Sequence, residues 1–178
     1  MTGDSTRYVA FLRGINVGGR NTVSMPQLRA LAEGLGHTEV RTYINSGNLL
    51  LSSTAGPAEL TEGLERALSD ELGLSIDVAV RSVDQLRAVL ADNPYPEGNP
   101  SQVTVAFLTG PAPEGAEQRV AAVAAEHERF TLTGSEVWVD YGDGLAHSKL
   151  AAQFIRVLGV SATVRNVRTV GKVLALND

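Results

Sequence analysis

The order of strand and helix patterns in residues 7–81 constrains the fold more than any other feature of the sequence. A buried strand pattern precedes a helix pattern that has Ser24 as its N-cap, and two short strand patterns follow at 40–45 and 48–53. A helix with leucines four residues apart and a strand at 75–81 complete the series β-α-β-β-α-β. This series is that of the ferredoxin-like unit, for which we expect the spatial strand order 4-1-3-2.

The second half of the chain follows a similar pattern without repeating the sequence. A strand at 102–109, a helix at 114–128, a hairpin around Gly134-Ser135 and a helix at 145–158 are predicted. Residues 163–176 keep a helical period, so we expect no clear fourth strand there. We therefore predict an α+β protein with two ferredoxin-like subdomains, the second degenerate and ending in a helix. The predicted boundaries are 1–82 for the first subdomain, 83–100 for a helix and linker, and 101–178 for the second α+β subdomain.

Composition excludes several functions. The 178 residues include 15 Lys plus Arg against 20 Asp plus Glu, a net charge of −5, which argues against extensive nucleic-acid coating. The chain has no cysteine, so disulfides, Cys-ligated zinc and thiol nucleophiles are excluded, and a reducing compartment fits. Neither a long apolar run nor a signal-peptide pattern is present, so we expect a cytoplasmic protein that does not enter membranes. We predict no cofactor, and the oligomeric state stays open.

Two Gly- and Asn-rich segments should meet at one edge of the first sheet. The loop after the first strand and the hairpin at Ser46-Gly47 both lie at that edge in a ferredoxin-like unit, beside the start of a helix. Unobstructed backbone N–H groups, guanidinium groups and amides suit an anion. The alternative is a long turn whose glycines supply positive φ. The predicted ligand-binding residues here are Arg13, Gly14, Asn16, Gly18, Gly19, Arg20, Asn21, Tyr43, Asn45, Ser46 and Asn48.

Two later segments are further candidates. Tyr141, Ser148 and Lys149 lie in and after an Asp-Gly-rich loop, where they could hold a phosphate or polarise a carbonyl; the alternative is a hairpin exit that caps a helix. Arg165 and Asn166 are placed at the start of the last helix, where an arginine is most often a surface residue. We predict no metal site, because Asp140 and Asp143 lack recognisable partner ligands and the three histidines are far apart in the sequence.

The same segments carry a family resemblance. The stretches 8–21 (YVAFLRGINVGGRN) and 41–48 (RTYINSGN), with YGDG and SKL near residues 141–150 and TVRN at 163–166, resemble the bacterial domain-of-unknown-function family numbered 1697. The resemblance implies two α+β subdomains of ferredoxin-like character and no established activity. The chain departs from the family pattern at Gly142, where proline is usual, and at Val167, where tryptophan is usual. Arg20 occupies a position where lysine is common.

The sequence is consistent with three functions. The preferred one is binding of a small phosphate- or nucleotide-like anion, with or without catalysis. The alternatives are a protein-interaction or regulatory domain without chemistry, and an RNA or single-stranded DNA module in which strand aromatics stack on bases. The distribution of charge favours the first, because residues 5–32 and 145–177 contain basic residues and no acid, whereas the acids gather on two helices.

Overall fold

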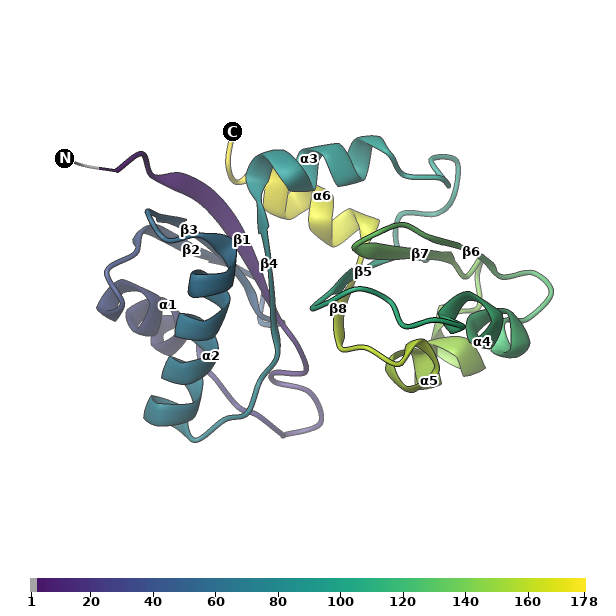
Figure 1. The fold of residues 1–178 in the computed structure, drawn as a ribbon, viewed down its shortest axis with the longest axis horizontal. Helices are drawn as coiled ribbons and strands as arrows, with labels where there is room; N and C mark the ends of the chain where they lie inside the picture. The colour runs from purple at the N-terminus through teal and green to yellow at the C-terminus, as the bar shows by residue number, and fades with distance from the viewer. Residues whose placement is uncertain (1–2) are drawn as a thin grey trace. The chain divides into compact units, whose positions relative to one another are not determined.

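The computed structural model describes residues 3–178 as a mixed α+β protein with two four-stranded antiparallel sheets and six helices (Figure 1). The chain divides into two compact units, Met1–Ala88 with Val173–Asp178 (unit 1) and Val89–Lys172 (unit 2). The predicted domain boundaries stay a prediction. The elements are β1 (Thr6–Leu12), α1 (Met25–Gly34), β2 (Thr38–Tyr43), β3 (Asn48–Ser53), α2 (Pro57–Leu72), β4 (Val78–Ser82), α3 (Val83–Ala91), β5 (Val103–Leu108), α4 (Ala116–Val123), β6 (Arg129–Leu132), β7 (Glu136–Asp140), a 3₁₀ turn (Leu145–His147), α5 (Lys149–Leu158), β8 (Ala162–Asn166) and α6 (Val167–Ala175).

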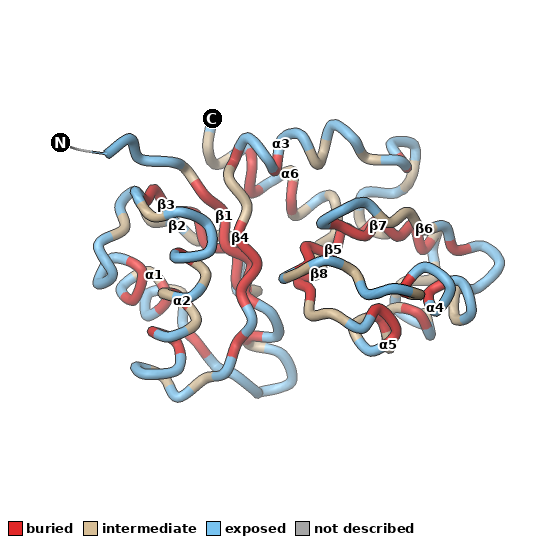
Figure 2. Tube along the Cα trace, viewed as in Figure 1, coloured by how far each residue is buried: buried red, intermediate tan, exposed pale blue. Residues whose placement is uncertain are grey.

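The sheet of unit 1 has the strand order β2-β3-β1-β4, with every neighbouring pair antiparallel. Strands β1 and β2 therefore run parallel with β3 between them, and their carboxyl ends lie at the same edge. Helices α1 and α2 cover one face (Figure 1), and their leucines, among them Leu28 and Leu64, form a core with Tyr8, Ala10 and Leu12 of β1. Figure 2 shows the buried stretch of β1 at the centre of this unit.

Local sequence chemistry sets the ends of the helices in unit 1. The Ser24 hydroxyl accepts a hydrogen bond from the Gln27 N–H at 3.2 Å, and the Gln27 side chain accepts one from the Ser24 N–H at 3.1 Å. This reciprocal capping box fixes the start of α1. At the C-terminal end of α2, Gly73 adopts a φ of 67° and ends the helix. The first helix therefore begins at a defined residue directly after the Gly- and Asn-rich loop.

The sheet of unit 2 has the strand order β6-β7-β5-β8. The expected absence of a fourth strand is wrong, because β8 pairs antiparallel with β5 from Ala162 to Asn166. This strand passes into α6 without a loop. Val164 belongs to the strand and Val167 and Val170 to the helix, and their spacing of three residues across the junction resembles a helical period. The predicted final helix is present, but it starts at Val167.

Residues 93–100 are held on the sheet of unit 2. Tyr95 is buried, and its hydroxyl forms a hydrogen bond of 2.7 Å with the Thr131 hydroxyl on β6. The Arg129 guanidinium lies 4.5 Å from the centre of the Tyr95 ring and also pairs with the carboxylates of Glu97 and Asp140. Arg129 therefore holds the segment that the sequence indicates as a linker, because it contacts Tyr95 and Glu97 of this segment and Asp140 of the sheet.

The final residues of the chain return to unit 1. The Arg7 Nε donates to the Asn177 side-chain oxygen at 2.8 Å, and Arg41 donates to the Leu176 carbonyl at 3.2 Å. Arg87 pairs with the Asp178 carboxylate at 3.0 Å. Three arginines from β1, β2 and α3 thus hold the C-terminal segment.

Candidate functional site

The loop between β1 and α1 is a preformed turn. Arg20 donates its backbone N–H to the Val17 carbonyl at 3.0 Å, and the two residues between them, Gly18 and Gly19, have φ of 58° and 73°. Positive φ at both central positions is typical of a type I′ turn and strongly favours glycine. The two glycines are thus required by the backbone conformation of this loop.

Asn16 joins this loop to the β2–β3 hairpin. Its side-chain Nδ2 donates to the Val23 carbonyl at 2.8 Å and to the backbone and side-chain oxygens of Asn45 at 3.0 and 3.1 Å. Its Oδ1 accepts the Val23 N–H at 2.9 Å. The two Gly- and Asn-rich segments therefore meet, as the strand order predicts. We refer to residues 13–21 and 43–48 together as the loop cluster; that it binds a ligand stays a prediction.

The hairpin turn is longer than the Ser46-Gly47 pair that the sequence indicates. Four residues, 44–47, separate β2 from β3, because Ile44 leaves the strand with φ 49°. Gly47 has φ 85° and packs against β1, where a Cβ would lie 2.8 Å from the Leu12 Cβ. The Leu12 N–H donates to the Gly47 carbonyl at 2.8 Å, which fixes the hairpin against the end of β1.

Asn48, Ser46 and Tyr43 hold the hairpin from within. Asn48 is completely buried, and its Nδ2 donates to the Tyr43 carbonyl and to the Ser46 hydroxyl, both at 3.1 Å. Tyr43 and Ser46 are half-buried. Asn21, the second asparagine of the first loop, donates to the Gly14 carbonyl at 3.1 Å. Several of the predicted ligand-binding amides are therefore used to build the loop cluster.

Donor groups nevertheless remain at its surface. Within residues 3–178, the backbone N–H groups of Gly18 and Gly19 have no acceptor and the Arg20 side chain has no hydrogen bond or ion pair. Arg13 is half-exposed and lies 3.6 Å from the Asp77 carboxylate. Since both groups of that pair are in contact with solvent, their attraction is weak and open to competition. The loop cluster thus presents two guanidinium groups and two unpaired N–H groups.

The remaining predicted residues belong to unit 2. Tyr141 is buried in its core, where burial and the nearby Glu128 carboxylate raise the pKa of the phenol. Ser148 caps α5 by accepting the Ala151 N–H at 3.1 Å, and it donates its hydroxyl to Glu128. Lys149, the first residue of α5, is exposed.

Arg165 and Asn166 end β8 and do not lie in the last helix as predicted. Burial lowers the pKa of Arg165 to about 10, and its Nη1 donates to the Val164 carbonyl at 3.0 Å. The Asn166 side chain accepts the Thr169 N–H at 2.8 Å and caps α6. These two residues belong to unit 2, whereas the loop cluster belongs to unit 1.

Unit 2 contains a cavity of about 450 Å³ that sequence reasoning did not indicate. It brings His127 and His147, which are not among the predicted ligand-binding residues, together with the candidates Ser148 and Lys149. The only sequence signal for this convergence is Gly144, where a Cβ would lie 3.2 Å from the His127 Nε2. The lining residues are Val123, Ala125, His127, Glu128, Gly144, His147, Ser148 and Lys149.

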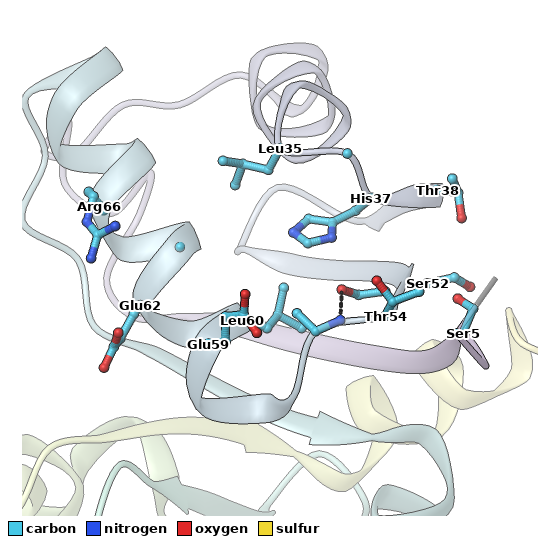
Figure 3. A pocket seen from close by; sticks show the side chains of 15 residues that line it. Ser5, Leu35, His37, Thr38, Ser52, Thr54, Glu59, Leu60, Glu62 and Arg66 are labelled. Carbon is cyan, nitrogen blue, oxygen red and sulfur yellow. Dashed lines mark hydrogen bonds between the residues drawn. The ribbon is translucent and has the colours of Figure 1, made fainter. Parts of the chain in front are cut away.

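A larger open pocket of about 590 Å³ lies in unit 1 between the C-terminal end of α1, the end of β3 and the start of α2 (Figure 3). His37 lies above Ser52 and Thr54 in this view, and burial lowers the pKa of its imidazole. None of the predicted ligand-binding residues lines it. Its walls combine hydroxyls, the apolar side chains of Leu35 and Leu60, and exposed charges of both signs, which gives the pocket no clear preference for one class of ligand.

Two further properties concern residues 3–178 as a whole. No three His, Cys, Asp or Glu side chains are grouped there in a way that would hold a metal ion. No helix in this part of the chain has both the length and the apolar character needed to cross a membrane.

The fold and the loop cluster define a two-unit α+β protein with a Gly- and Asn-rich edge on its first sheet. The chain belongs to the family described as "Protein of unknown function (DUF1697)", whose model matches residues 5–138. That range includes both loops of the cluster and ends before Tyr141. The chain is similar in structure to the conserved bacterial protein SP0830 from Streptococcus pneumoniae, with a TM-score of 0.77 and 25% sequence identity over 98% of this chain and 100% of that one. No curated protein matches it.

Proposed function

We propose that this protein binds a small phosphate- or nucleotide-like anion at the loop cluster. The observation that carries the proposal is the Gly18-Gly19-Arg20 turn, where two N–H groups without acceptors in residues 3–178 adjoin an exposed guanidinium. Backbone N–H groups unobstructed by side chains, with an arginine beside them, are a recurrent way to hold a phosphate. Because Asn16 and Asn45 fix the loop, little ordering entropy opposes binding.

Arg13 and two apolar side chains define the rest of the proposed site. Arg13 would exchange the solvated Asp77 carboxylate for the ligand anion. Val17 and Ile44, which adjoin the linked asparagines, are 65% and 54% exposed and offer an apolar surface. A ligand that has a flat apolar group next to its phosphate would cover this surface, and this supports a nucleotide over inorganic phosphate.

A thermal-shift titration with adenosine monophosphate tests the proposal. We expect the ligand to raise the melting temperature of the wild-type chain and to do so much less for Arg20→Gln. Arg66→Gln is the matched control, since Arg66 is an exposed arginine of the same unit outside the loop cluster. The proposed site would be refuted if the ligand stabilised the Arg20→Gln and Arg66→Gln variants equally. It would also be refuted if neither this ligand nor other nucleotides and sugar phosphates stabilised the wild-type chain.

Protein interaction is the second candidate function, and the exposure of Val17 and Ile44 favours it. A Val17→Ser/Ile44→Ser double variant that loses a partner protein but keeps nucleotide binding would support this alternative. The nucleic-acid alternative has less support, because Tyr8 and Phe11 of β1 are 5% and 0% exposed and present no ring for base stacking.

We further infer that both units are ferredoxin-like and that the protein works in the cytoplasm. The β-α-β-β-α-β order and the matching strand orders of the two sheets support the first inference. The absence of cysteine from the sequence supports the second, since such a chain has no need of an oxidising compartment.

A further inference from the structure

We propose a second ligand site, in unit 2: the cavity beside Lys149 binds the phosphate group of a small organic phosphate. This site consists of residues of unit 2, whereas the loop cluster consists of residues of unit 1. Its volume of about 450 Å³ falls in the range of small-molecule pockets and exceeds what a bare phosphate needs. The ligand is therefore expected to carry an organic group as well as the anion.

The side chains that can meet a ligand here are mostly hydrogen-bond donors. Lys149 is exposed and has no ion pair within the described residues, and His127 and His147 line the same cavity. An ammonium group and two imidazoles supply N–H groups of the kind that oxyanions accept. These three groups come from the α4–β6 connection, the 3₁₀ turn and the start of α5, and their presence in one cavity is the main evidence for the ligand class.

The acidic residue in the cavity is already engaged. Glu128 is 8% exposed, and its two oxygens accept the Ala125 N–H and the Ser148 hydroxyl. Ser148 in turn accepts the Ala151 N–H. Glu128 and Ser148 thus shape the wall, and the ligand would be held by Lys149 and the histidines.

Gly144 keeps the cavity open next to His127. A Cβ at Gly144 would lie 3.2 Å from the His127 Nε2, so a side chain there would crowd the imidazole. Val123 and Ala125 supply an apolar wall. An anion at Lys149 with an aromatic or aliphatic group against Val123 would use both parts of the cavity.

Nuclear magnetic resonance of the histidine rings gives a direct test. The chain has three histidines, and His37 belongs to unit 1, so it serves as an internal reference. The probe is phenyl phosphate, titrated into the intact protein at constant pH, and phenol is the control without the phosphate. We expect the ring signals of His127 and His147 to move and saturate with phenyl phosphate while the His37 signal stays in place.

Variants locate the site. Lys149 and Lys172 are the two lysines of the chain, and both are exposed, so Lys172→Gln is the matched control for Lys149→Gln. Lys149→Gln should weaken binding about ten-fold, as expected for loss of one charged contact, and Lys172→Gln and Arg20→Gln should leave it unchanged. The inference is overturned if phenyl phosphate moves no ring signal, if His37 responds equally, if phenol binds as well, or if the two lysine variants weaken binding equally. Loss of binding in Arg20→Gln as well would place the anion at the loop cluster instead.

Discussion

The side-chain amide of Asn16 donates to both the backbone and the side-chain oxygen of Asn45, 29 residues later in the sequence. The same amide donates to the Val23 carbonyl, so one side chain joins the first loop, the approach to α1 and the hairpin. The backbone of Asn16 has a φ of 55°, a conformation that asparagine tolerates better than most residues do. This amide makes the side-chain hydrogen bonds that join the two loops of the proposed anion site.

Replacing Asn16 with aspartate tests the contribution of these hydrogen bonds. Asn16→Asp keeps the acceptor for the Val23 N–H but loses the donors, so we expect a loss of about 1–3 kcal/mol in the free energy of unfolding. Asn21→Asp is the matched control, since Asn21 also has positive φ but its side chain donates, among the described residues, only to the Gly14 carbonyl. Native-state hydrogen exchange of β1 and β3 amides measures the difference, and equal losses in the two variants would contradict the special role of Asn16.

Glycine is required at position 47 by contact as well as by backbone conformation. Gly47→Ala should cost about 2–5 kcal/mol, because the new methyl would lie 2.8 Å from the Leu12 Cβ and φ is 85°. Gly18→Ala also meets positive φ, but nothing lies within 4 Å of its Cβ, so about 1–2 kcal/mol is expected. Urea denaturation followed by far-ultraviolet circular dichroism gives both losses in the free energy of unfolding. If Gly47→Ala loses no more than Gly18→Ala, then β1 can shift to make room for the methyl group.

The Asp140 carboxylate makes unit 2 sensitive to acid. Burial opposes its ionisation, but the hydrogen bonds from Arg129 and from the Gly142 N–H outweigh burial and lower its pKa. A carboxylate with a lowered pKa stabilises the folded state above its ordinary pKa of about 4, and this stability is lost as pH falls through the lower folded value.

Arg129→Gln should therefore lower the midpoint of thermal unfolding at pH 7 and reduce its decline between pH 5 and 3. Trp138, the single tryptophan of the chain, is buried on β7 and reports this unfolding by fluorescence. Arg156→Gln is a suitable control, because Arg156 is an exposed arginine of the same unit whose side chain, within residues 3–178, bonds only to Gln153. An unchanged pH dependence in Arg129→Gln would exclude this explanation.

The contact between Arg7 and Asn177 should stabilise unit 1. Asn177→Ala removes the bond from Arg7 and the bond to the Val173 carbonyl, so we expect a loss of about 1–2 kcal/mol. Asp178→Ala removes only an exposed ion pair with Arg87 and should cost less than about 1 kcal/mol. Hydrogen exchange of the β1 and β4 amides measures both; a larger effect of Asp178→Ala would contradict the assignment.

Local patterns predicted much of the fold. The capping serine at 24, the leucines of α2 and the hairpins are encoded in neighbouring residues, and the strand order of unit 1 followed from the element order. The strand β8 was missed because Val164 and Val167 have helical spacing although they belong to different elements. Ile44 could not be predicted at φ 49°, because β-branched residues avoid that conformation unless the surrounding structure imposes it.

The candidate sites were predictable to different degrees. The meeting of Asn16 and Asn45 follows from the strand order, because parallel strands end at the same edge of the sheet. By contrast, no local pattern relates His127 to Lys149. Their proximity arises from the way the α4–β6 connection packs beside the start of α5, and this packing cannot be predicted from a single sequence. For the same reason, only the structure shows that Asn48 is buried and stabilises its own hairpin.

The return of residues 173–178 to unit 1 has a consequence for how the chain is made. During synthesis, residues 1–88 leave the ribosome first, but the arginines at 7, 41 and 87 gain their partners only after all of unit 2 has been translated. Domains usually fold in the order in which they emerge. Here unit 1 completes its contacts only when residues 173–178 are present, so a variant truncated after residue 172 would contain the whole of unit 2 and lack part of unit 1.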